Sequence, residues 1–417
     1  MKDLSAPGMT TAIRGASVIL EDGLAETDVT LAGDRIAAIG DSAPADREID
    51  GRGLVLAPAM VDVHGDAFER QVMPRPGVYF PQAQALMETD RQLAANGIAT
   101  AYHALTLSWE PGLRATARGE EMIAALEGLA PRLSVENRLQ LRWETFAFEA
   151  VPVIERALTG PLLPAIAFND HVSMQMRDFD MPLQTRPFEH GPDYRAAHFD
   201  DPRLTARIAG SARRAGIEAG EYLYRLRQVW DRREEVVAMI RRIAAAGRSV
   251  RAPMLSHDDS QLAGRRFFRQ LGSRISEFPM TPALAEAAHR EGDAVILGAP
   301  NAMRGRSHLG SVSAGDMVEA GLCDALASDY SYPAMLAAVA RLDAEKRADR
   351  AALWALVSSG PAAAMGLEDR GRIAPGLRAD LVLVDWPAGG DPAIRCTIAG
   401  GRTAYLSEPR GQVRGSA

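Results

Sequence analysis

Short apolar runs alternate with amphipathic stretches between about residue 59 and residue 365. This alternation is typical of βαβ units, whose strands form a parallel sheet. Eight such strands close a (β/α)8 barrel, and the apolar runs are residues 59–63, 98–104, 139–144, 164–168, 251–256, 274–278, 294–298 and 324–328. We therefore predict an α/β fold with a TIM-like barrel over residues 59–365, in which residues 203–246 form the longest helix.

The two ends of the chain have a different pattern, with short alternating segments separated by turns that contain glycine. Residues 11–20 are followed by such a turn and by residues 28–33, and residues 379–385 lead into a second hairpin pattern at 395–402. We predict that residues 1–58 and 366–417 together form a small composite β-sandwich domain.

Most of the apolar runs end in side chains that can bind a metal ion. The carboxyl ends of barrel strands lie on one face, so these side chains are expected to converge there. His64 and Asp66 are two positions apart, which places both side chains on the same side of an extended strand. The predicted metal ligands are His64, Asp66, Glu144, His171, His257 and Asp329.

Imidazole nitrogens and carboxylate oxygens suit one or two divalent ions, and we predict zinc, with manganese or iron as alternatives. Such an ion lowers the pKa of bound water to about 7, which favours hydrolysis. A carboxylate after the last strand can contact both the ion and its water, so Asp329 is the predicted proton acceptor and is assigned with His257 as catalytic. A single histidine after an apolar run is more often structural, and the prediction therefore depends on the convergence of the set.

Four further polar residues near strand ends are predicted to orient the ligands. Only one of three adjacent side chains can comfortably bind an ion, so Asp258 and Asp259 are assigned to hydrogen bonds with His257 or to helix capping. Glu277 receives the same orienting role. His103 is left open between a ligand and a hydrogen-bond partner of a ligand.

The chain contains only two lysines, Lys2 and Lys346, and neither follows a predicted barrel strand. A carbamylated lysine, which joins two ions in many barrel hydrolases, is therefore excluded. If two ions bind, Glu144 is the best candidate for the bridging ligand.

Two predicted loops on the same barrel face are rich in arginine, which can grip phosphate or phosphonate oxygens with two parallel hydrogen bonds. They predict a small anionic, phosphorylated substrate, although the same arginines could be solvated loop residues. The predicted substrate-binding residues are Arg70, Arg75, Asn301, Arg304, Arg306 and His308.

The overall composition excludes several classes of protein. Hydrophobic residues make up 47% and charged residues 24% of the 417 residues, which is typical of a globular chain. The net charge of −7 gives no reason to expect nucleic acid or a membrane surface as a partner. Two cysteines, no long apolar run and no secretory pattern at the N-terminus together favour a cytoplasmic protein. The oligomeric state is left open, including a homo-oligomer.

The sequence resembles the amidohydrolase superfamily, and within it the phosphonate-utilisation branch. The resemblance is carried by segments in order along nearly the whole chain, among them Pro58-Ala59-Met60-Val61-Asp62-Val63-His64, Leu141-Arg142-Trp143-Glu144, Ser256-His257-Asp258-Asp259, Ser328-Asp329-Tyr330 and Gly376-Leu377-Arg378-Ala379-Asp380-Leu381-Val382. It implies a metal-dependent diphosphatase whose substrate is a ribose 5-triphosphate with a phosphonate at the anomeric carbon. Metal hydroxide would attack the α-phosphorus and pyrophosphate would leave, while the arginine-rich loops neutralise the developing charge. The six predicted ligands would form the metal and base set.

Residues 172–178, which follow His171, depart from the pattern of that branch. This departure leads to a second hypothesis, hydrolysis of an amide, cyclic amide or amidine bond in a small metabolite. A third hypothesis is a barrel that has lost its metals and its activity. The intact set of predicted ligands argues against this third hypothesis.

Overall fold

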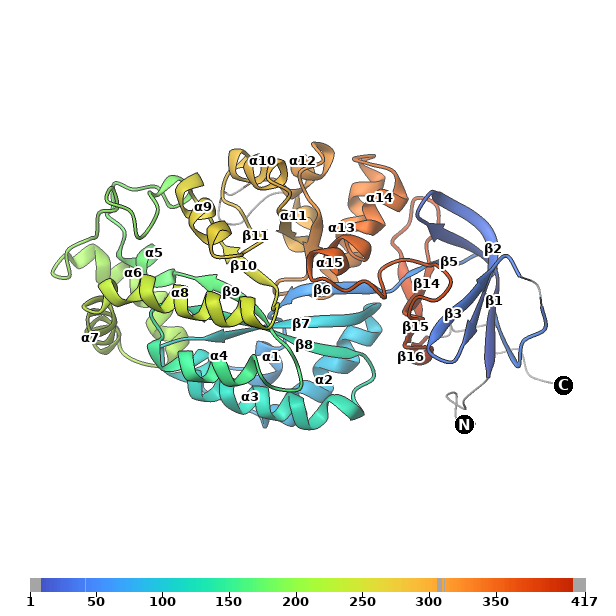
Figure 1. Cartoon of the computed structure of the whole chain (residues 1–417), viewed down its shortest axis with the longest axis horizontal. Helices are drawn as coiled ribbons and strands as arrows, with labels where there is room; N and C mark the ends of the chain where they lie inside the picture. Colours follow the sequence, from blue (N-terminus) through green and yellow to red (C-terminus); the bar gives the residue numbers. More distant parts are fainter. Residues whose placement is uncertain (1–8, 42, 306–309, 311, 408–417) are drawn as a thin grey trace.

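Eight parallel strands form a barrel in the larger part of the molecule (Figure 1), and the computed structural model describes residues 9–41, 43–305, 310 and 312–407. Each predicted apolar run overlaps one strand, and neighbours in sequence are neighbours in the sheet. The predicted fold class is thus confirmed. The barrel strands are β6 (Met60–Gly65), β7 (Ile98–Leu107), β8 (Glu136–Glu144), β9 (Ala165–Asn169), β10 (Met254–His257), β11 (Ile275–Glu277), β12 (Ala294–Gly298) and β13 (Ala325–Ala327).

Helices follow the barrel strands and cover the outside of the barrel (Figure 1). The predicted long helix at 203–246 is wrong, because the structure has three helices there, α6, α7 and α8. Gly216 ends α6 with a left-handed backbone (φ 72°), which stops a helix. The helices are α1 (Glu69–Val72), α2 (Gln82–Ala95), α3 (Thr116–Leu129), α4 (Val151–Ala157), α5 (His171–Met176), α6 (Pro202–Ala215), α7 (Ala219–Trp230), α8 (Arg233–Ser249), α9 (Leu262–Gln270), α10 (Pro282–Arg290), α11 (Ala299–Arg304), α12 (Ala314–Glu319), α13 (Ala334–Ala344), α14 (Arg350–Ala355) and α15 (Ser359–Ala364).

A second sheet of eight strands is built from both ends of the chain and lies beside the barrel (Figure 1). The two ends meet where Leu381 pairs with Pro58, in an antiparallel ladder between β14 and β5. Residues Ile13, Leu56 and Leu383 are among those that form its buried core. Its strands are β1 (Thr10–Leu20), β2 (Gly23–Ala32), β3 (Arg35–Ile39), β4 (Arg47–Asp50), β5 (Val55–Pro58), β14 (Leu381–Asp385), β15 (Ala393–Ala399) and β16 (Arg402–Leu406).

The barrel closes through hydrogen bonds between its first and last strands. The buried Asp62 carboxylate accepts from the Ser328 amide at 2.9 Å and from the Ser328 hydroxyl at 2.6 Å. One residue further on, the Asp329 amide donates to the His64 carbonyl at 2.8 Å, and the Asp66 amide donates to the Asp329 carbonyl at 2.9 Å. Three predicted ligands are therefore held in a fixed register by the backbone.

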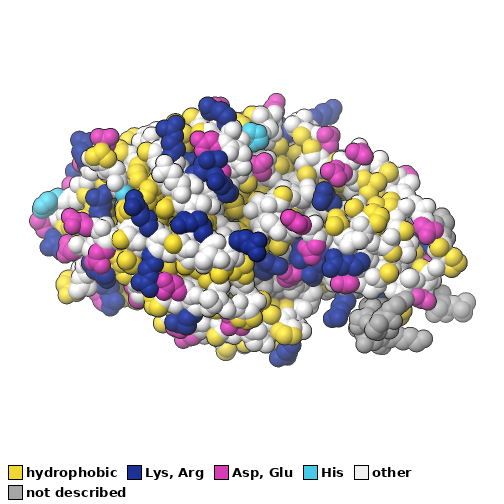
Figure 2. All heavy atoms as spheres, in the orientation of Figure 1, with side chains coloured by type: hydrophobic (Ala, Val, Ile, Leu, Met, Phe, Trp, Pro, Cys, Tyr) yellow, Lys and Arg dark blue, Asp and Glu magenta, His cyan; other side chains and the backbone are white. Residues whose placement is uncertain are grey.

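The outer surface mixes both signs of charge. On the face seen in Figure 2, basic side chains (Lys and Arg) and acidic side chains are interspersed, with hydrophobic atoms between them. Among the described residues, no helix has the length and apolar character needed to cross a membrane.

Gly65 lies at the point of closure, and we expect Gly65→Ala to destabilise the protein. A Cβ atom there would lie 2.6 Å from Asp62 Oδ2 and 3.0 Å from a ring carbon of Tyr332. Overpacking a buried site typically costs about 1–3 kcal/mol, so the midpoint of urea unfolding should fall. Gly128→Ala in α3 is the matched control, because a Cβ there meets no atom within 4 Å and alanine favours a helix. Equal stability of the two variants would contradict the tight packing inferred at Gly65.

Candidate active site

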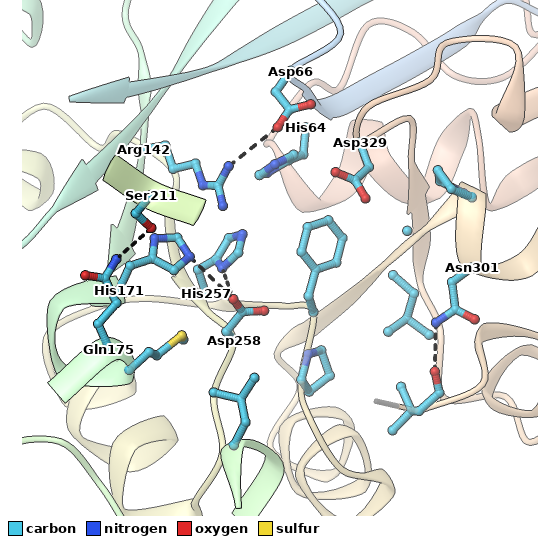
Figure 3. Close-up of a pocket in the computed structure, with 18 of the residues that line it drawn as sticks. His64, Asp66, Arg142, His171, Gln175, Ser211, His257, Asp258, Asn301 and Asp329 are labelled. Carbon is cyan, nitrogen blue, oxygen red and sulfur yellow. Dashed lines mark hydrogen bonds and ion pairs between the residues drawn. The ribbon is translucent and has the colours of Figure 1, made fainter. Parts of the chain in front are cut away.

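Donor atoms at the carboxyl ends of the barrel strands form two groups that share His64. The first group is His64, His257 and Glu277, and the second is His64, Asp66 and Asp329, with the donor atoms of each group within 4.8 Å of one another. Figure 3 shows these histidine and aspartate side chains around the inner end of one cavity. The structure thus brings together four of the six predicted ligands.

Three residues within two positions of the end of a barrel strand have left-handed backbones although they are not glycine. They are Asp258 (φ 57°), Phe278 (φ 54°) and Asp329 (φ 53°). Each still donates its amide hydrogen to the next strand, since the acceptors are the carbonyls of Glu277, Ile296 and His64 respectively. Such strained conformations persist only where the surroundings fix them, and they gather at functional sites. Here they turn side chains into the cavity while the sheet stays intact.

The buried atoms of the first group suit a divalent ion. Neither ring nitrogen of His64 or His257 has a well-aligned hydrogen bond with a described residue, and the same holds for Glu277 Oε2. Buried polar atoms are nearly always hydrogen-bonded, so these nitrogens and this oxygen are available for a cation. Glu277 Oε1 lies 3.0 Å from His64 Nδ1, and Oε2 lies 3.8 Å from His257 Nε2. Glu277, expected only to orient a ligand, therefore belongs among the donors.

Ionisation of Glu277 and His257 fits this arrangement, whereas at His64 the attraction to Glu277 outweighs burial and raises the pKa of the imidazole. Burial opposes the charged form of Glu277, but His64, His257 and the hydrogen bond from Gln140 together outweigh it and lower the pKa of the carboxyl group. Burial lowers the pKa of His257, which favours the neutral imidazole that binds metals. The site thus offers a carboxylate and a neutral histidine.

Glu144 and His171 form a separate pair at the side of the cavity. A Glu144 carboxylate oxygen contacts His171 Nδ1, and the other accepts from the His171 amide at 3.1 Å. Burial opposes the charged form of Glu144, but the contact with His171 prevails and lowers its pKa to about 2. Asp258 connects this pair to the first group, because its carboxylate lies 3.0 Å from His257 Nδ1 and 4.0 Å from His171 Nε2. Asp258 has the position expected of a residue that orients the ligands.

An arginine lies among the donors, and the sequence analysis missed it. Arg142 is buried on β8, with Nη1 3.6 Å from Asp66 Oδ2 and Nε donating to Asn169 at 3.2 Å. It precedes Glu144 by two positions, so strand alternation alone would have placed it inside the barrel. Gln140, two positions earlier, also points inward and donates to Glu277 at 2.8 Å.

Two residues expected to orient ligands lie elsewhere. His103 faces the helices outside the barrel, because its neighbour Tyr102 packs in the barrel interior and alternate residues face opposite sides. Its Nε2 is 2.7 Å from the Asn137 side chain, and burial lowers its pKa to about 4. The Asp259 carboxylate accepts from the Ser256 hydroxyl at 2.5 Å and lies 3.8 Å from Arg265. The predicted roles of His103 and Asp259 at the site are therefore corrected.

The donors open into a cavity of about 430 Å³ whose wall is rich in arginine. Much of the wall comes from the segment between β9 and β10, which contains α5 and α6. Arg207, Ser211 and Arg214 line the cavity together because they are four and three positions apart on α6, and such residues share one helix face. This helical spacing was the sequence signal available for these residues. The six arginines that line the cavity are Arg114, Arg142, Arg177, Arg207, Arg214 and Arg304.

The predicted substrate-binding residues are divided between several places. Asn301 and Arg304 line the cavity, but Asn301 uses its side chain to bind the Val312 carbonyl at 2.8 Å and the Ala314 amide at 3.2 Å. Arg70 is exposed and donates to the Tyr330 carbonyl, and Arg75 lies on an exposed turn. Neither arginine is among the residues that line the cavity. Arg306 and His308 lie outside the described residues.

Comparisons with known proteins agree with the fold. The chain is 32% identical over 378 residues to the alpha-D-ribose 1-methylphosphonate 5-triphosphate diphosphatase of Escherichia coli K12, covering 89% of this chain and 94% of that protein. An adenosine deaminase from Xanthomonas campestris with bound zinc is similar in structure, with a TM-score of 0.60, 14% identity and coverage of 95% and 93%. A beta-aspartyl dipeptidase from Fervidobacterium islandicum AW-1 has a TM-score of 0.57, 15% identity and coverage of 98% and 100%.

The two structural similarities, at such low identity, show a shared fold alone. The sequence match shows the family as well, because residues 179–405 fit the sequence profile described as the amidohydrolase family. This match spans more than half of the chain, and the relative from Escherichia coli extends it to nine-tenths. The resemblance seen in the sequence is confirmed, and the chain belongs to the amidohydrolase family.

Proposed function

We propose that this protein is a metal-dependent hydrolase that cleaves a ribose 1-phosphonate 5-triphosphate to the 5-phosphate and pyrophosphate. The observation that carries the proposal is the cavity itself, with six arginines on its wall and metal-binding donors at its inner end. Arginine binds phosphate oxygens in pairs of hydrogen bonds, so this wall suits a substrate with several phosphate groups. The extent of the similarity to the Escherichia coli diphosphatase supports the same substrate class.

His64, Asp66, His257, Glu277 and Asp329 are the residues that would hold the ion, with zinc as the proposed metal. A bound divalent ion lowers the pKa of water towards neutrality and withdraws charge from phosphoryl oxygens. Glu144 and His171 are proposed as the ligands of a second ion, with Asp258 as their link to the first group.

The protein side chains have defined roles in the proposed reaction. Asp329 accepts a proton from the attacking water, whose oxygen forms the new bond to the α-phosphorus. The bond between the α-phosphorus and the oxygen that leads to the β-phosphorus breaks, and that oxygen leaves with pyrophosphate. Arg142, deep in the cavity, stabilises negative charge on the α-phosphoryl oxygens as it develops.

An amide, cyclic amide or amidine with an acidic group is the second candidate substrate. Residues Met174, Gln175 and Arg177, within the segment that departs from the pattern of the phosphonate-utilisation branch, all line the cavity. Ammonia or a new carboxylate would then be the product, in place of pyrophosphate.

We expect purified, zinc-loaded protein to release pyrophosphate from ribose 1-methylphosphonate 5-triphosphate. Release should cease when the ion is removed by chelation and return when zinc is added back. Asp329→Asn should lower kcat by about 10²- to 10⁴-fold, because an amide cannot accept the proton. Pyrophosphate is measured with a coupled enzyme assay, at metal contents determined by mass spectrometry.

The control is Asp231→Asn, which also replaces an aspartate by asparagine but at an exposed position between α7 and α8. It should leave kcat unchanged. The first candidate substrate is wrong if metal-loaded wild-type protein releases no pyrophosphate from the triphosphate. Release of ammonia or a carboxylate from amides by the same protein would then support the second candidate.

A separate measurement tests the proposed second ion. Glu144→Gln should lower the number of zinc ions per chain, because a neutral amide is a poor metal ligand. Glu149→Gln, at an exposed position nearby, should keep the wild-type zinc content. If both variants bind as much zinc as the wild type, Glu144 is not a ligand and acts only on the orientation of His171.

A further inference from the structure

Two arginines on the cavity wall lie next to each other and are held by backbone carbonyls. Arg207 on α6 donates from Nη1 to the Gln175 carbonyl at 2.8 Å and also to the carbonyl of Arg177. Arg177, just after α5, donates to the carbonyls of Met174 at 2.6 Å and Met181 at 3.3 Å. Both side chains line the cavity and both residues are half-buried.

Neither arginine of this pair has an acidic partner within 4 Å among the described residues. The pair differs in this from three other arginines of the cavity. Arg114 lies 2.8 Å from Glu69, Arg142 lies 3.6 Å from Asp66, and Arg214 lies 3.6 Å from Glu110. The positive charge of those three is balanced within the protein.

Placing two positive charges together at a half-buried position is unfavourable. Burial and the neighbouring Arg177 both lower the pKa of Arg207, and burial and Arg186 lower that of Arg177. The stability cost would be offset by an anion that accepts hydrogen bonds from both guanidinium groups.

An aromatic ring fixes the position of one member of the pair. The Arg207 guanidinium stacks over Phe179, 3.9 Å from the ring centre, and Arg203 lies over the same ring at 4.2 Å. Arg203, however, is exposed, bonded to Asp201 at 2.7 Å and not among the residues that line the cavity. Arg207 is therefore oriented before any ligand arrives, which lowers the entropic cost of binding.

We propose that Arg177 and Arg207 form the subsite for the β- and γ-phosphates of the substrate, the part that leaves as pyrophosphate. This inference rests on the proposed function. Of the groups in that substrate, the two terminal phosphates carry the most negative charge. They match the two adjacent, half-buried positive charges of Arg177 and Arg207, which are held by backbone carbonyls instead of carboxylates. By neutralising the charge that develops on the leaving group, the pair would also favour bond cleavage.

The test is calorimetric binding of inorganic pyrophosphate to zinc-loaded protein. Arg177→Gln and Arg207→Gln should each raise the Kd by about tenfold or more, because each loses hydrogen bonds to a charged group. Arg203→Gln is the matched control, since it shares the helix and the Phe179 ring but not the cavity, and its Kd should stay within twofold of the wild type. Circular dichroism and zinc content verify that each variant is folded and loaded.

Arg207→Lys provides a second variant that keeps the charge and loses the paired hydrogen bonds. Its Kd should lie between those of the wild type and Arg207→Gln. Wild-type Kd values in folded Arg177→Gln and Arg207→Gln would overturn the subsite, as would a wild-type protein that does not bind pyrophosphate.

The binding experiment and the hydrolysis assay can fail independently. If the wild type releases no pyrophosphate from the triphosphate, yet the two glutamine variants lose pyrophosphate affinity, the subsite stands and the proposed reaction is wrong. If hydrolysis proceeds and the variants bind pyrophosphate normally, the reaction stands and the subsite is wrong.

Discussion

The closure of the barrel is the constraint on which the site depends. The Asp62 carboxylate holds Ser328, and two backbone hydrogen bonds then place Asp329 against His64 and Asp66. Asp62 and Ser328 are 266 positions apart in the sequence, so the closure joins distant parts of the chain. Because barrel strands can shift only in whole residues, a change of register here would move Asp329 away from the two donors of β6. The backbone hydrogen bonds of the sheet therefore fix the relative positions of His64, Asp66 and Asp329 more than the rotamers of their side chains do.

The carboxylates of the cavity are gathered at its inner end, whereas arginines are spread over its wall. Carboxylates of Asp66, Glu277 and Asp329 gather at the inner end, where Arg142 and the histidines are their neighbours. Arginines line much of the rest of the wall, and three of them, Arg177, Arg207 and Arg304, have no acidic partner within 4 Å among the described residues. Buried charges are unfavourable without such neighbours, and the proposed cation at the inner end and the proposed anion at Arg177 and Arg207 would each offset part of this cost. A ligand with a phosphate chain would be oriented by this separation of charge, with its chain along the arginine wall.

The sequence was sufficient for features that follow from local pattern and barrel topology. Each strand run could be recognised, and the positions of His64, Asp66, His257 and Asp329 followed from the rule that strand ends share a face. The rule fails for His103, which lies in the middle of a strand that extends to Leu107, so alternation decides its direction. Arg177 and Arg207 could not be placed, because their proximity depends on the path of the long segment between β9 and β10. Gly216 could have indicated that this segment contains separate helices.

The interleaving of the two chain ends in one sheet determines the order in which the molecule can be assembled during translation. Strand β5 lies between β1 and β14, so one of its two edges stays unpaired until the ribosome has delivered residues beyond Leu381. Strand β6 likewise waits for β13. A nascent chain therefore exposes two unpaired strand edges for most of its synthesis, and such edges pair readily with other chains. The two edges on which closure of the sheet and of the barrel depends are thus among the last to find their partners.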